Sequence, residues 1–257
     1  MTTSIVFCTG GSGGLGKSTG SRWLAHTAAQ TGAHVVLVDG NPGQQSQRMF
    51  LNIPDTYNLE SARLEGLRRA LVPPKRLNQR YAMLAGPSDP HDPDMSADYL
   101  DAILAICGMD VQLIVVDADR IDERQWDDPD SFPGGVIRPL VDQHDARICF
   151  RIGQTGSQLD DGLAALSAID RAARTLAIGV TPLSARPLPS NRWRDMTDGL
   201  ARFGGVDQWT TESARMIDDR KPGWPAGREP TWLRHILTWL HQPTPAVKET
   251  RSWCHRR

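Results

Sequence analysis

The chain has 257 residues, of which 39% are hydrophobic, enough for one large α/β domain with a sizeable core. Its formal net charge of -1 excludes an overall field that recruits nucleic acid or an acidic membrane surface. The four cysteines are scattered without a C-x-x-C pair, and the sequence has neither a basic leader nor an apolar run of about eighteen residues. We therefore expect a cytoplasmic protein without a signal peptide or a membrane span.

The first predicted element is a buried strand over residues 4–8, because these apolar, β-prone residues are too few for a helix. A glycine-rich loop follows, and residues 11–18 match the phosphate-loop pattern G-x-x-x-x-G-K-[ST]. From Lys17 to about Gln30, apolar side chains recur at helical spacing. The loop thus lies between a strand and a helix, the setting that a phosphate loop requires.

The residue types of this loop suit phosphate chemistry. Glycines let backbone N–H groups converge on an anion, and the helix N-terminus adds the positive end of its dipole. Lys17 can reach the β- and γ-phosphates, and the Ser18 hydroxyl can ligate Mg²⁺. The competing interpretation is a glycine-rich turn that binds nothing. We expect nucleotide contacts from Gly11, Ser12, Gly13, Gly14, Leu15, Gly16, Lys17, Ser18 and Thr19.

A second strand is predicted over residues 34–39, a continuous apolar run typical of a parallel sheet that is covered on both faces. It ends in Asp39, and a carboxylate at the carboxyl end of a parallel strand lies at the edge of the sheet where ligands bind. The alternative is that Asp39 only caps a turn.

Residues 10–19 (GGSGGLGKST) and residues 36–42 (VLVDGNP) together resemble the ParA/MinD family of deviant Walker-A ATPases. That family usually reads K-G-G-x-G-K-[ST]-[ST], followed by a strand that ends in D-x-D-P. The resemblance is specific over residues 4–46 and weaker near 111–120, 146–185 and 203–224. It implies a P-loop NTPase fold of the SIMIBI type, an ATP-dependent homodimer, and non-specific DNA and a small DNA-binding adaptor protein as partners.

The chain departs from this family at two positions. Ser12 stands where the family has a signature lysine that reaches the phosphates of the partner subunit, so that contact is absent or is made by another cation. Asn41 stands where a second aspartate positions or activates the attacking water. An amide can orient water but cannot accept its proton. The resemblance therefore implies a slow ATPase with Lys17, Asp39 and Asn41 as its catalytic residues.

Residues 47–80 form the most basic part of the chain. Apolar residues between Leu59 and Leu71 recur near helical spacing, and Pro73 and Pro74 end the pattern. The segment is interpreted either as a solvated helix face or as a surface for DNA phosphates or an acidic partner. Its basic residues are Arg63, Arg68, Arg69, Lys75, Arg76 and Arg80.

A helix predicted over residues 96–107, with Ser96 as its N-cap, precedes a β-branched strand over residues 111–116. The strand runs into Asp117, and an apolar strand that ends in aspartate is the Walker-B arrangement. We expect Mg²⁺ to be held by Ser18, Asp39 and Asp117, with Asp119 as the alternative to Asp117. The competing interpretation of Asp117 is a turn aspartate.

In the second half of the chain, the acidic stretch 122–135 is expected to be a mobile loop, with Trp126 either an interface anchor or a packed side chain. The pattern then predicts strand 146–152, helix 158–173, strand 176–182, and helices over 190–203 and 229–241. In relatives the end of the 176–182 strand approaches the base, which assigns Thr181 and Pro182 to nucleotide contacts. No N-K-x-D element occurs at a strand end, which favours ATP over GTP.

Alternating strands and helices predict an α/β fold, a doubly wound, mostly parallel sheet with helices on both faces. We expect one P-loop ATPase domain over residues 1–245 and a basic tail over 246–257. The function that follows is a ParA-like ATPase switch in plasmid or chromosome partition, positioning or transfer of a mobile element. Two alternatives stay open: a nucleotide-binding regulator or scaffold that barely hydrolyses ATP, and an ATP-dependent metabolic enzyme of the same fold.

Overall fold

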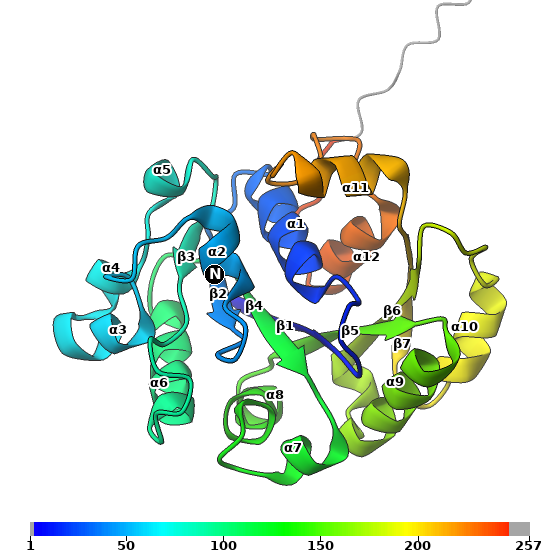
Figure 1. Cartoon of the computed structure of the whole chain (residues 1–257), viewed down its shortest axis with the longest axis horizontal. Helices are drawn as coiled ribbons and strands as arrows, with labels where there is room; N and C mark the ends of the chain where they lie inside the picture. The colour runs from blue at the N-terminus through cyan, green and yellow to red at the C-terminus, as the bar shows by residue number, and fades with distance from the viewer. Residues whose placement is uncertain (1–2, 247–257) are drawn as a thin grey trace, which may run out of the picture.

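The computed structural model describes residues 3–246, and within this range seven strands form one sheet (Figure 1). The strands are β1 (Ser4–Gly10), β2 (Val35–Gly40), β3 (Ala82–Leu84), β4 (Leu113–Arg120), β5 (Arg147–Gly153), β6 (Thr175–Thr181) and β7 (Arg202–Gln208). The longer helices are α1 (Lys17–Ala29), α6 (Met95–Cys107), α9 (Gly156–Ile169), α10 (Ser190–Thr197), α11 (Thr211–Asp218) and α12 (Thr231–Trp239). Short helices connect them: α2 (Ser46–Leu51), α3 (Leu59–Glu65), α4 (Leu67–Ala70), α5 (Pro74–Leu77), α7 (Glu123–Asp127) and α8 (Arg138–Gln143).

The strands lie in the order β3-β2-β4-β1-β5-β6-β7, and every neighbouring pair is parallel. The chain moves from β1 toward one edge of the sheet and later returns to its other side. The strand order therefore reverses beside β1, and open parallel sheets bind ligands at such a point, outside the carboxyl ends of the strands. The predicted doubly wound parallel fold is confirmed.

Helices cover both faces of this sheet, as Figure 1 shows for α1, α11 and α12 on one side and α6, α8 and α9 on the other. Successive residues of a strand point to opposite faces. Accordingly Val6 and Cys8 pack in a core cluster with Trp23 of α1, whereas Ile5 and Phe7 join a second cluster on the opposite face. The two cores hold the sheet between the helical layers, and the ends of the strands stay open to ligands.

The predicted helix over residues 190–203 is wrong in its second half. Helix α10 ends at Thr197, and residues 202–208 form the edge strand β7. Two glycines and few β-branched residues hide this strand from a pattern search. One of them, Gly205, has φ 129° beside a register shift of β7 against β6, a conformation that side chains rarely adopt.

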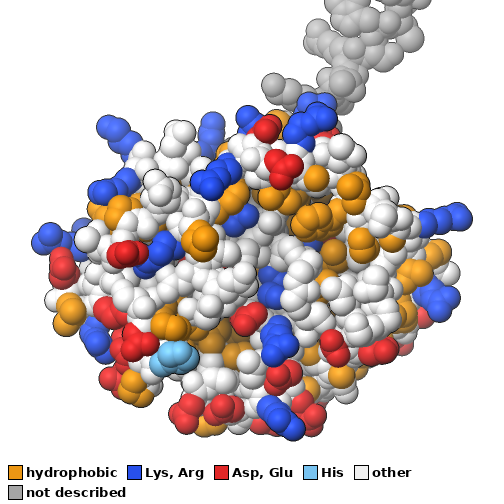
Figure 2. All heavy atoms as spheres, viewed as in Figure 1, with side chains coloured by type: hydrophobic (Ala, Val, Ile, Leu, Met, Phe, Trp, Pro, Cys, Tyr) orange, Lys and Arg blue, Asp and Glu red, His pale blue; other side chains and the backbone are white. Residues whose placement is uncertain are grey.

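The expectation of a mobile acidic loop over residues 122–135 is also wrong in part. Helix α7 begins after Asp122, whose carboxylate accepts the backbone N–H of Gln125, and a single π-helical turn covers Pro133–Ile137. Trp126 is 3% exposed and packs in the core, so it is not a surface anchor. Acidic side chains gather along the lower edge of the molecule in Figure 2, over α7 and the region around it.

Smaller differences concern the ends of elements. Helix α6 begins at Met95 with Asp94 as its N-cap, so Ser96 does not cap it. Helix α9 ends at Ile169, and a 3-10 turn over Ala172–Arg174 leads into β6. Most of the predicted basic tail, residues 247–257, lies outside the described residues. Among residues 3–246, no helix combines the length and apolar composition needed to cross a bilayer.

Candidate functional site

The glycine-rich loop connects the carboxyl end of β1 to the first turn of α1. Gly14 and Gly16 adopt left-handed backbone conformations with φ 72° and 69°, which only glycine reaches without strain. The Lys17 Nζ donates to the carbonyl oxygen of Ser12 at 3.0 Å, and this bond closes the loop around the N-terminus of α1. The loop therefore has the strand, turn and helix that its sequence predicted.

Lys17 is a buried cation with 8% of its side chain exposed. Burial lowers the pKa of its ammonium group, while Asp119 and Asp117 act in the opposite direction. The Asp119 carboxylate lies 3.9 Å from Nζ, at the exposed end of β4. Lys17 is thus desolvated and only weakly paired. In such a low-dielectric setting, the attraction between its ammonium group and a bound anion is strong.

Asp39 and Asp117 are direct register partners on the neighbouring strands β2 and β4. Both are fully buried. The Asp117 carboxylate accepts hydrogen bonds from Ser21 Oγ at 3.1 Å and from Gln47 Nε2 at 2.6 Å. Strands in a sheet lie about 4.8 Å apart, so the topology brings together two carboxylates that are 78 positions apart in the sequence.

Burial shapes the ionisation of this carboxylate pair. Desolvation, followed by the nearby Asp117 charge, raises the pKa of Asp39 to about 8. Desolvation also raises the pKa of Asp117, against hydrogen bonds from Gln47, Ser18 and Ser21 and the nearby Arg22 charge. In the described structure no hydrogen-bond donor reaches Asp39 Oδ1. Two desolvated carboxylates, one with an orphaned oxygen, form a place where a divalent cation would be stabilised.

The residues present fit Mg²⁺ only together with ligands from a nucleotide. Residues 3–246 contain no group of three or more His, Cys, Asp or Glu side chains that could hold a metal by themselves. Mg²⁺ commonly binds one or two carboxylates, a hydroxyl, phosphate oxygens and water. Ser18, Asp39 and Asp117 would supply the protein's share of that set.

We expect the variant Asp39→Asn to stabilise the metal-free and nucleotide-free protein near pH 8. Because the pKa of Asp39 rises from 3.8 to about 8 on folding, its contribution to stability is complete below pH 4 and is lost as the pH rises toward 8. The asparagine carries no such charge. The gap in free energy of unfolding between the variant and the wild type should widen by on the order of 4 kcal/mol between pH 5 and pH 8, roughly 8–16 °C in Tm.

Thermal melts with a chelator present at pH 5, 6, 7 and 8 would measure this gap. The comparison with Asp39→Asn cancels the titration of all other groups. Parallel curves for the two proteins would show that Asp39 is ionised in the folded chain throughout this range, contrary to the expectation.

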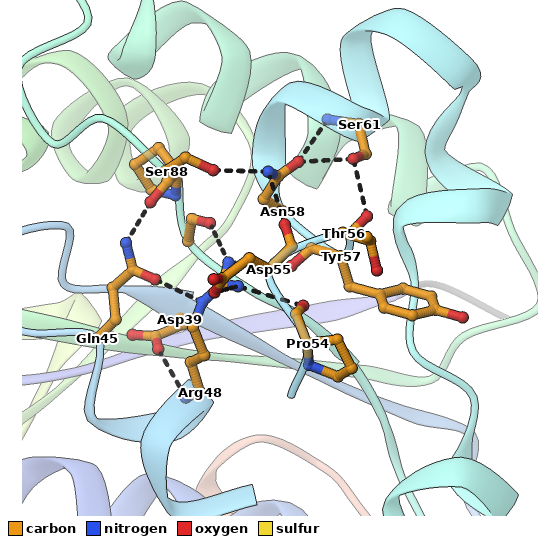
Figure 3. A network of polar contacts seen from close by, with 12 residues as sticks. Asp39, Gln45, Arg48, Pro54, Asp55, Thr56, Tyr57, Asn58, Ser61 and Ser88 are labelled. Atoms are coloured by element: carbon orange, nitrogen blue, oxygen red, sulfur yellow. Dashed lines mark hydrogen bonds and ion pairs between the residues drawn. The ribbon is translucent and has the colours of Figure 1, made fainter. Parts of the chain in front are cut away.

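Helix α2 lies beside Asp39, and Arg48 of this helix is the centre of a network of polar contacts (Figure 3). The backbone N–H of Arg48 donates to Asp39 Oδ2 at 3.4 Å. Its guanidinium group donates to the carbonyl oxygens of Pro54, Tyr57 and Gly86 and to the Asp55 carboxylate. Through these bonds Arg48 joins α2, the loop that follows α2 and the segment just after β3 into one network. Movement of α2 would therefore disturb Asp39 and this loop together.

Gln47, also on α2, contacts the other carboxylate. Its Nε2 donates to Asp117 Oδ2 and, at 2.9 Å, to the Ser18 carbonyl oxygen. Its Oε1 accepts from the buried guanidinium group of Arg22 at 3.0 Å. The Gln47 amide thus occupies Asp117 Oδ2. A water or metal ligand could use this oxygen only if Gln47 gave up its bond or shared the oxygen. Because Gln47 lies on α2, a movement of this helix would change access to Asp117.

The two positions that depart from the family motif both make contacts within this chain. Ser12 Oγ donates to Asp161 Oδ2 of α9 at 3.1 Å, and 8% of Ser12 is exposed. Asn41 is 6% exposed, and its Oδ1 accepts the backbone N–H of Gln44 at 3.2 Å. Ser12 is therefore directed toward a neighbouring helix, and the Asn41 side chain holds the turn after β2.

The Thr181 hydroxyl, at one of the two positions predicted to contact the base, makes a hydrogen bond within the chain. Thr181 is fully buried, and its Oγ1 donates to Gln154 Oε1 at 2.8 Å. The backbone N–H of Trp209 donates to the Thr181 carbonyl oxygen at 3.0 Å. The half-buried Trp209 ring lies against Gly16, so closely that a Cβ there would be 2.7 Å from it. The sequence pattern predicted no role for Trp209, whose ring packs against the Gly16 end of the phosphate loop.

Arg151 is a second residue that the sequence analysis missed. It is 2% exposed, its Nε donates to the Leu15 carbonyl oxygen at 2.7 Å, and it forms an ion pair with the buried Asp207. Its guanidinium group also lies over the Trp232 ring, 5.1 Å from the centroid. Arg151 therefore ties the phosphate loop to β5 and β7. An arginine inside an otherwise apolar parallel strand was the signal in the sequence that could have revealed it.

The basic residues of segment 63–80 do not form one uniformly charged surface. Arg63 lies within ion-pair distance of Asp92, Asp94 and Asp98. Arg69 pairs with Glu65, and Arg76 stacks on the Tyr57 ring at 4.7 Å. These contacts neutralise part of the segment and favour its interpretation as a solvated, ion-paired face.

The chain is similar in structure to several solved proteins. Cell division ATPase MinD from Pyrococcus furiosus aligns with a TM-score of 0.67 at 14% identity, over 93% of this chain and 97% of that one. A putative plasmid partition protein from Borrelia burgdorferi bound to AMPPNP aligns with a TM-score of 0.64 at 13% identity, over 94% of this chain and 99% of that one.

This chain has the fold of MinD and plasmid partition ATPases. Septum site-determining protein MinD from Pyrococcus horikoshii, solved with Mg-ADP, aligns at a TM-score of 0.64 and 17% identity, over 93% of this chain and 95% of that one. No protein-family model matches the sequence, and a search of curated proteins finds no match. On the MinD-like fold, Lys17, Asp39 and Asp117 lie at the carboxyl edge of the sheet beside β1.

Proposed function

We propose that this chain is a ParA-like ATP-binding switch that hydrolyses ATP slowly with Mg²⁺ and acts in partition, positioning or transfer of DNA. The observation that carries the proposal is the convergence of the Lys17 loop and the start of α1 with the Asp39–Asp117 pair at one edge of the sheet. There Ser21 bonds to Asp117, and Gln47 bonds to both Asp117 and the Ser18 carbonyl oxygen. The similarity to folds solved with Mg-ADP and AMPPNP supports it.

The chemistry that this arrangement supports is positioning and charge neutralisation. Backbone N–H groups of residues 13–18 would cradle the phosphates, and the desolvated Lys17 would stabilise charge on the β- and γ-phosphoryl oxygens. Ser18 and Asp117 would hold Mg²⁺, which neutralises charge between these phosphates, and Asp39 would complete the acidic pair. Asn41 can orient a water molecule but cannot take its proton, which makes turnover slow.

The partners proposed for this switch follow from the resemblance to the ParA/MinD family. They are a second copy of the chain in an ATP-dependent homodimer, non-specific DNA and a small DNA-binding adaptor protein. Ser12 bonds to Asp161 in its own chain, so position 12 would not supply a cation to a partner subunit.

The second candidate is a nucleotide-binding regulator with almost no turnover. It is favoured by the Gln47 amide on Asp117 and by the absence of a carboxylate at position 41. This candidate binds ATP through the same loop as the first one, so measurements of binding alone do not distinguish the two.

ATP turnover by the purified full-length chain, with and without DNA, tests the proposal. We expect Mg²⁺-dependent release of phosphate that rises when DNA is added. ATP binding without measurable release under either condition would favour the regulator. Absence of binding to any adenine nucleotide in the presence of Mg²⁺ would overturn both candidates.

We expect Trp209→Ala to weaken ATP binding roughly 3- to 10-fold, the range for loss of one aromatic contact. The ring closes the loop at Gly16 and would lie beside the base or the ribose. Trp209→Phe, which keeps an aromatic ring there, serves as the matched control and should bind nearly as well as the wild type. Equal affinities of all three proteins in a fluorescent-nucleotide titration would exclude this position as a wall of the nucleotide site.

A further inference from the structure

A cavity lies at the amino ends of the strands, on the opposite side of the sheet from the carboxyl ends that carry the phosphate loop. It has a volume of about 820 Å³ and opens between α12 and the amino ends of β5, β6 and β7. We call it the Arg147 cavity. Its charged and titratable lining residues are Arg147, Arg174, Arg202, His235 and His241.

The lining of the Arg147 cavity is strongly basic. None of its lining residues is acidic. Arg174 pairs with Asp145, whereas within residues 3–246 no carboxylate lies within ion-pair distance of Arg147 or Arg202. Three guanidinium groups and one carboxylate leave two positive charges in this lining without a protein counter-ion.

Arg147 is the most constrained of these cations. Its guanidinium group lies 5.2 Å from the centroid of the Trp239 ring and donates to the Trp239 carbonyl oxygen. The Arg147 side chain is half-buried, and this burial lowers the pKa of its guanidinium group. A partly desolvated cation whose described contacts are a carbonyl oxygen and an aromatic ring would be strongly stabilised by a bound anion.

The remaining polar groups of the cavity come from α12, the turn before β6 and the start of β7. His235 Nδ1 lies 2.6 Å from the Gly204 carbonyl oxygen and donates to it, since a carbonyl oxygen can only accept. The exposed Arg202 lies at the start of β7, and Arg174 lies in the turn before β6. Cations from three separate elements thus surround one concave space.

We propose that the Arg147 cavity binds a small phosphorylated anion with at least two negative charges, such as pyrophosphate or a nucleoside phosphate. A single phosphoryl group carries two charges on a compact tetrahedron, which guanidinium groups approaching from several sides can share. The cavity volume of about 820 Å³ lies within the roughly 300–1,000 Å³ of small-molecule sites, and cations on several sides of a concave space suit a compact phosphate.

This site is independent of the nucleotide site of the proposed function. Arg147 and Gly153 lie at opposite ends of β5, which spans about 20 Å at roughly 3.3 Å per residue. The phosphate loop contacts the other end of this strand through Arg151. Loss of one site should therefore leave the other intact.

Calorimetric titration of pyrophosphate into the full-length variant Lys17→Ala tests the proposal, because this background disables the phosphate loop. We expect one pyrophosphate to bind, and Arg202→Glu in the same background to weaken that binding at least tenfold. Arg174→Glu is a second, independent change with the same expected result. Arg192→Glu, an equal charge change on the exposed side of α10 outside the cavity, is the matched control and should have no effect.

Absence of pyrophosphate binding to Lys17→Ala would overturn the proposal, as would binding unaffected by both cavity variants. A parallel titration with duplex DNA separates the two sources of phosphate. If Arg202→Glu reduced DNA binding while pyrophosphate had no affinity for the cavity, the ligand would be a nucleic-acid backbone and the small-ligand proposal would be wrong. Thermal melts of each variant identify any loss of binding that comes from unfolding.

Discussion

The variant Lys17→Ala is expected to bind ATP at least 100-fold more weakly than the wild type and to show no measurable hydrolysis. Lys17 is a buried cation inside the loop, and its weak pairing with Asp119 leaves its charge available to phosphate. A charge-assisted bond to a phosphate in such a water-excluded site is worth about 2.7–4 kcal/mol, which corresponds to roughly 100- to 1,000-fold. Alanine removes this bond and leaves the backbone N–H groups of the loop in place.

The same substitution is expected to leave the stability of the nucleotide-free chain nearly unchanged. It removes one hydrogen bond to the Ser12 carbonyl oxygen, but it also removes the cost of burying an ammonium group. Loss of binding would therefore not result from unfolding. Lys221→Ala, at an exposed lysine after α11, is the control and should bind ATP as the wild type does.

Equilibrium binding of a fluorescent ATP analogue and a thermal melt of each variant measure these two effects separately. ATP affinity of Lys17→Ala within about threefold of the wild type would show that the loop does not hold the phosphates, and the proposed function would fail with it.

The variant Arg151→Met is expected to destabilise the chain by about 3–5 kcal/mol, the usual cost of removing one partner of a buried ion pair. Asp207, 3% exposed, would lose its counter-ion. The Leu15 carbonyl oxygen would lose its donor, and the ring of Trp232 would lose the cation stacked on it. Methionine keeps most of the volume of the side chain, so the cost would come from the unpaired groups and not from a cavity.

The double variant Arg151→Met/Asp207→Leu separates stability from loop positioning. With both charges removed, most of the lost stability should return, because no buried charge is left unpaired. Nucleotide affinity should stay reduced, since the bond to Leu15 that positions the loop is absent in both variants. Urea unfolding gives the first quantity and nucleotide titration the second. Full recovery of affinity in the double variant would show that Arg151 stabilises the fold without positioning the loop.

Local sequence patterns predicted much of the fold and part of the candidate site. The phosphate loop, the strand before it and the buried positions Trp23, Leu24 and Ala28 of α1 follow from glycine placement and helical spacing, and the structure has them. Strand β4 was recognisable because its apolar run ends in Asp117. These features depend on neighbouring residues alone, so the sequence carries them directly.

Features that depend on long-range packing were predicted less well. Strand β7 was missed because an edge strand with two glycines resembles a loop in sequence, and it is held only by pairing with β6. The helix α7 and the burial of Trp126 in the acidic stretch depend on the neighbouring core, which no local pattern contains. The roles predicted for Thr181 and Pro182 at the base remain predictions, and Trp209 was not recognised beside them.

The sequence by itself determined that this chain has a glycine loop able to wrap an anion and two apolar strands that end in aspartate, because turn chemistry and hydrophobic periodicity are local properties. Only the tertiary structure decided that Asp39 and Asp117 are register partners and that Arg151 holds the loop from a distant strand. The physical reason is that strand order and burial come from the packing of the whole sheet. The same packing desolvates the carboxylates and sets their pKa values, and it gathers three arginines around a cavity at the amino ends of the strands.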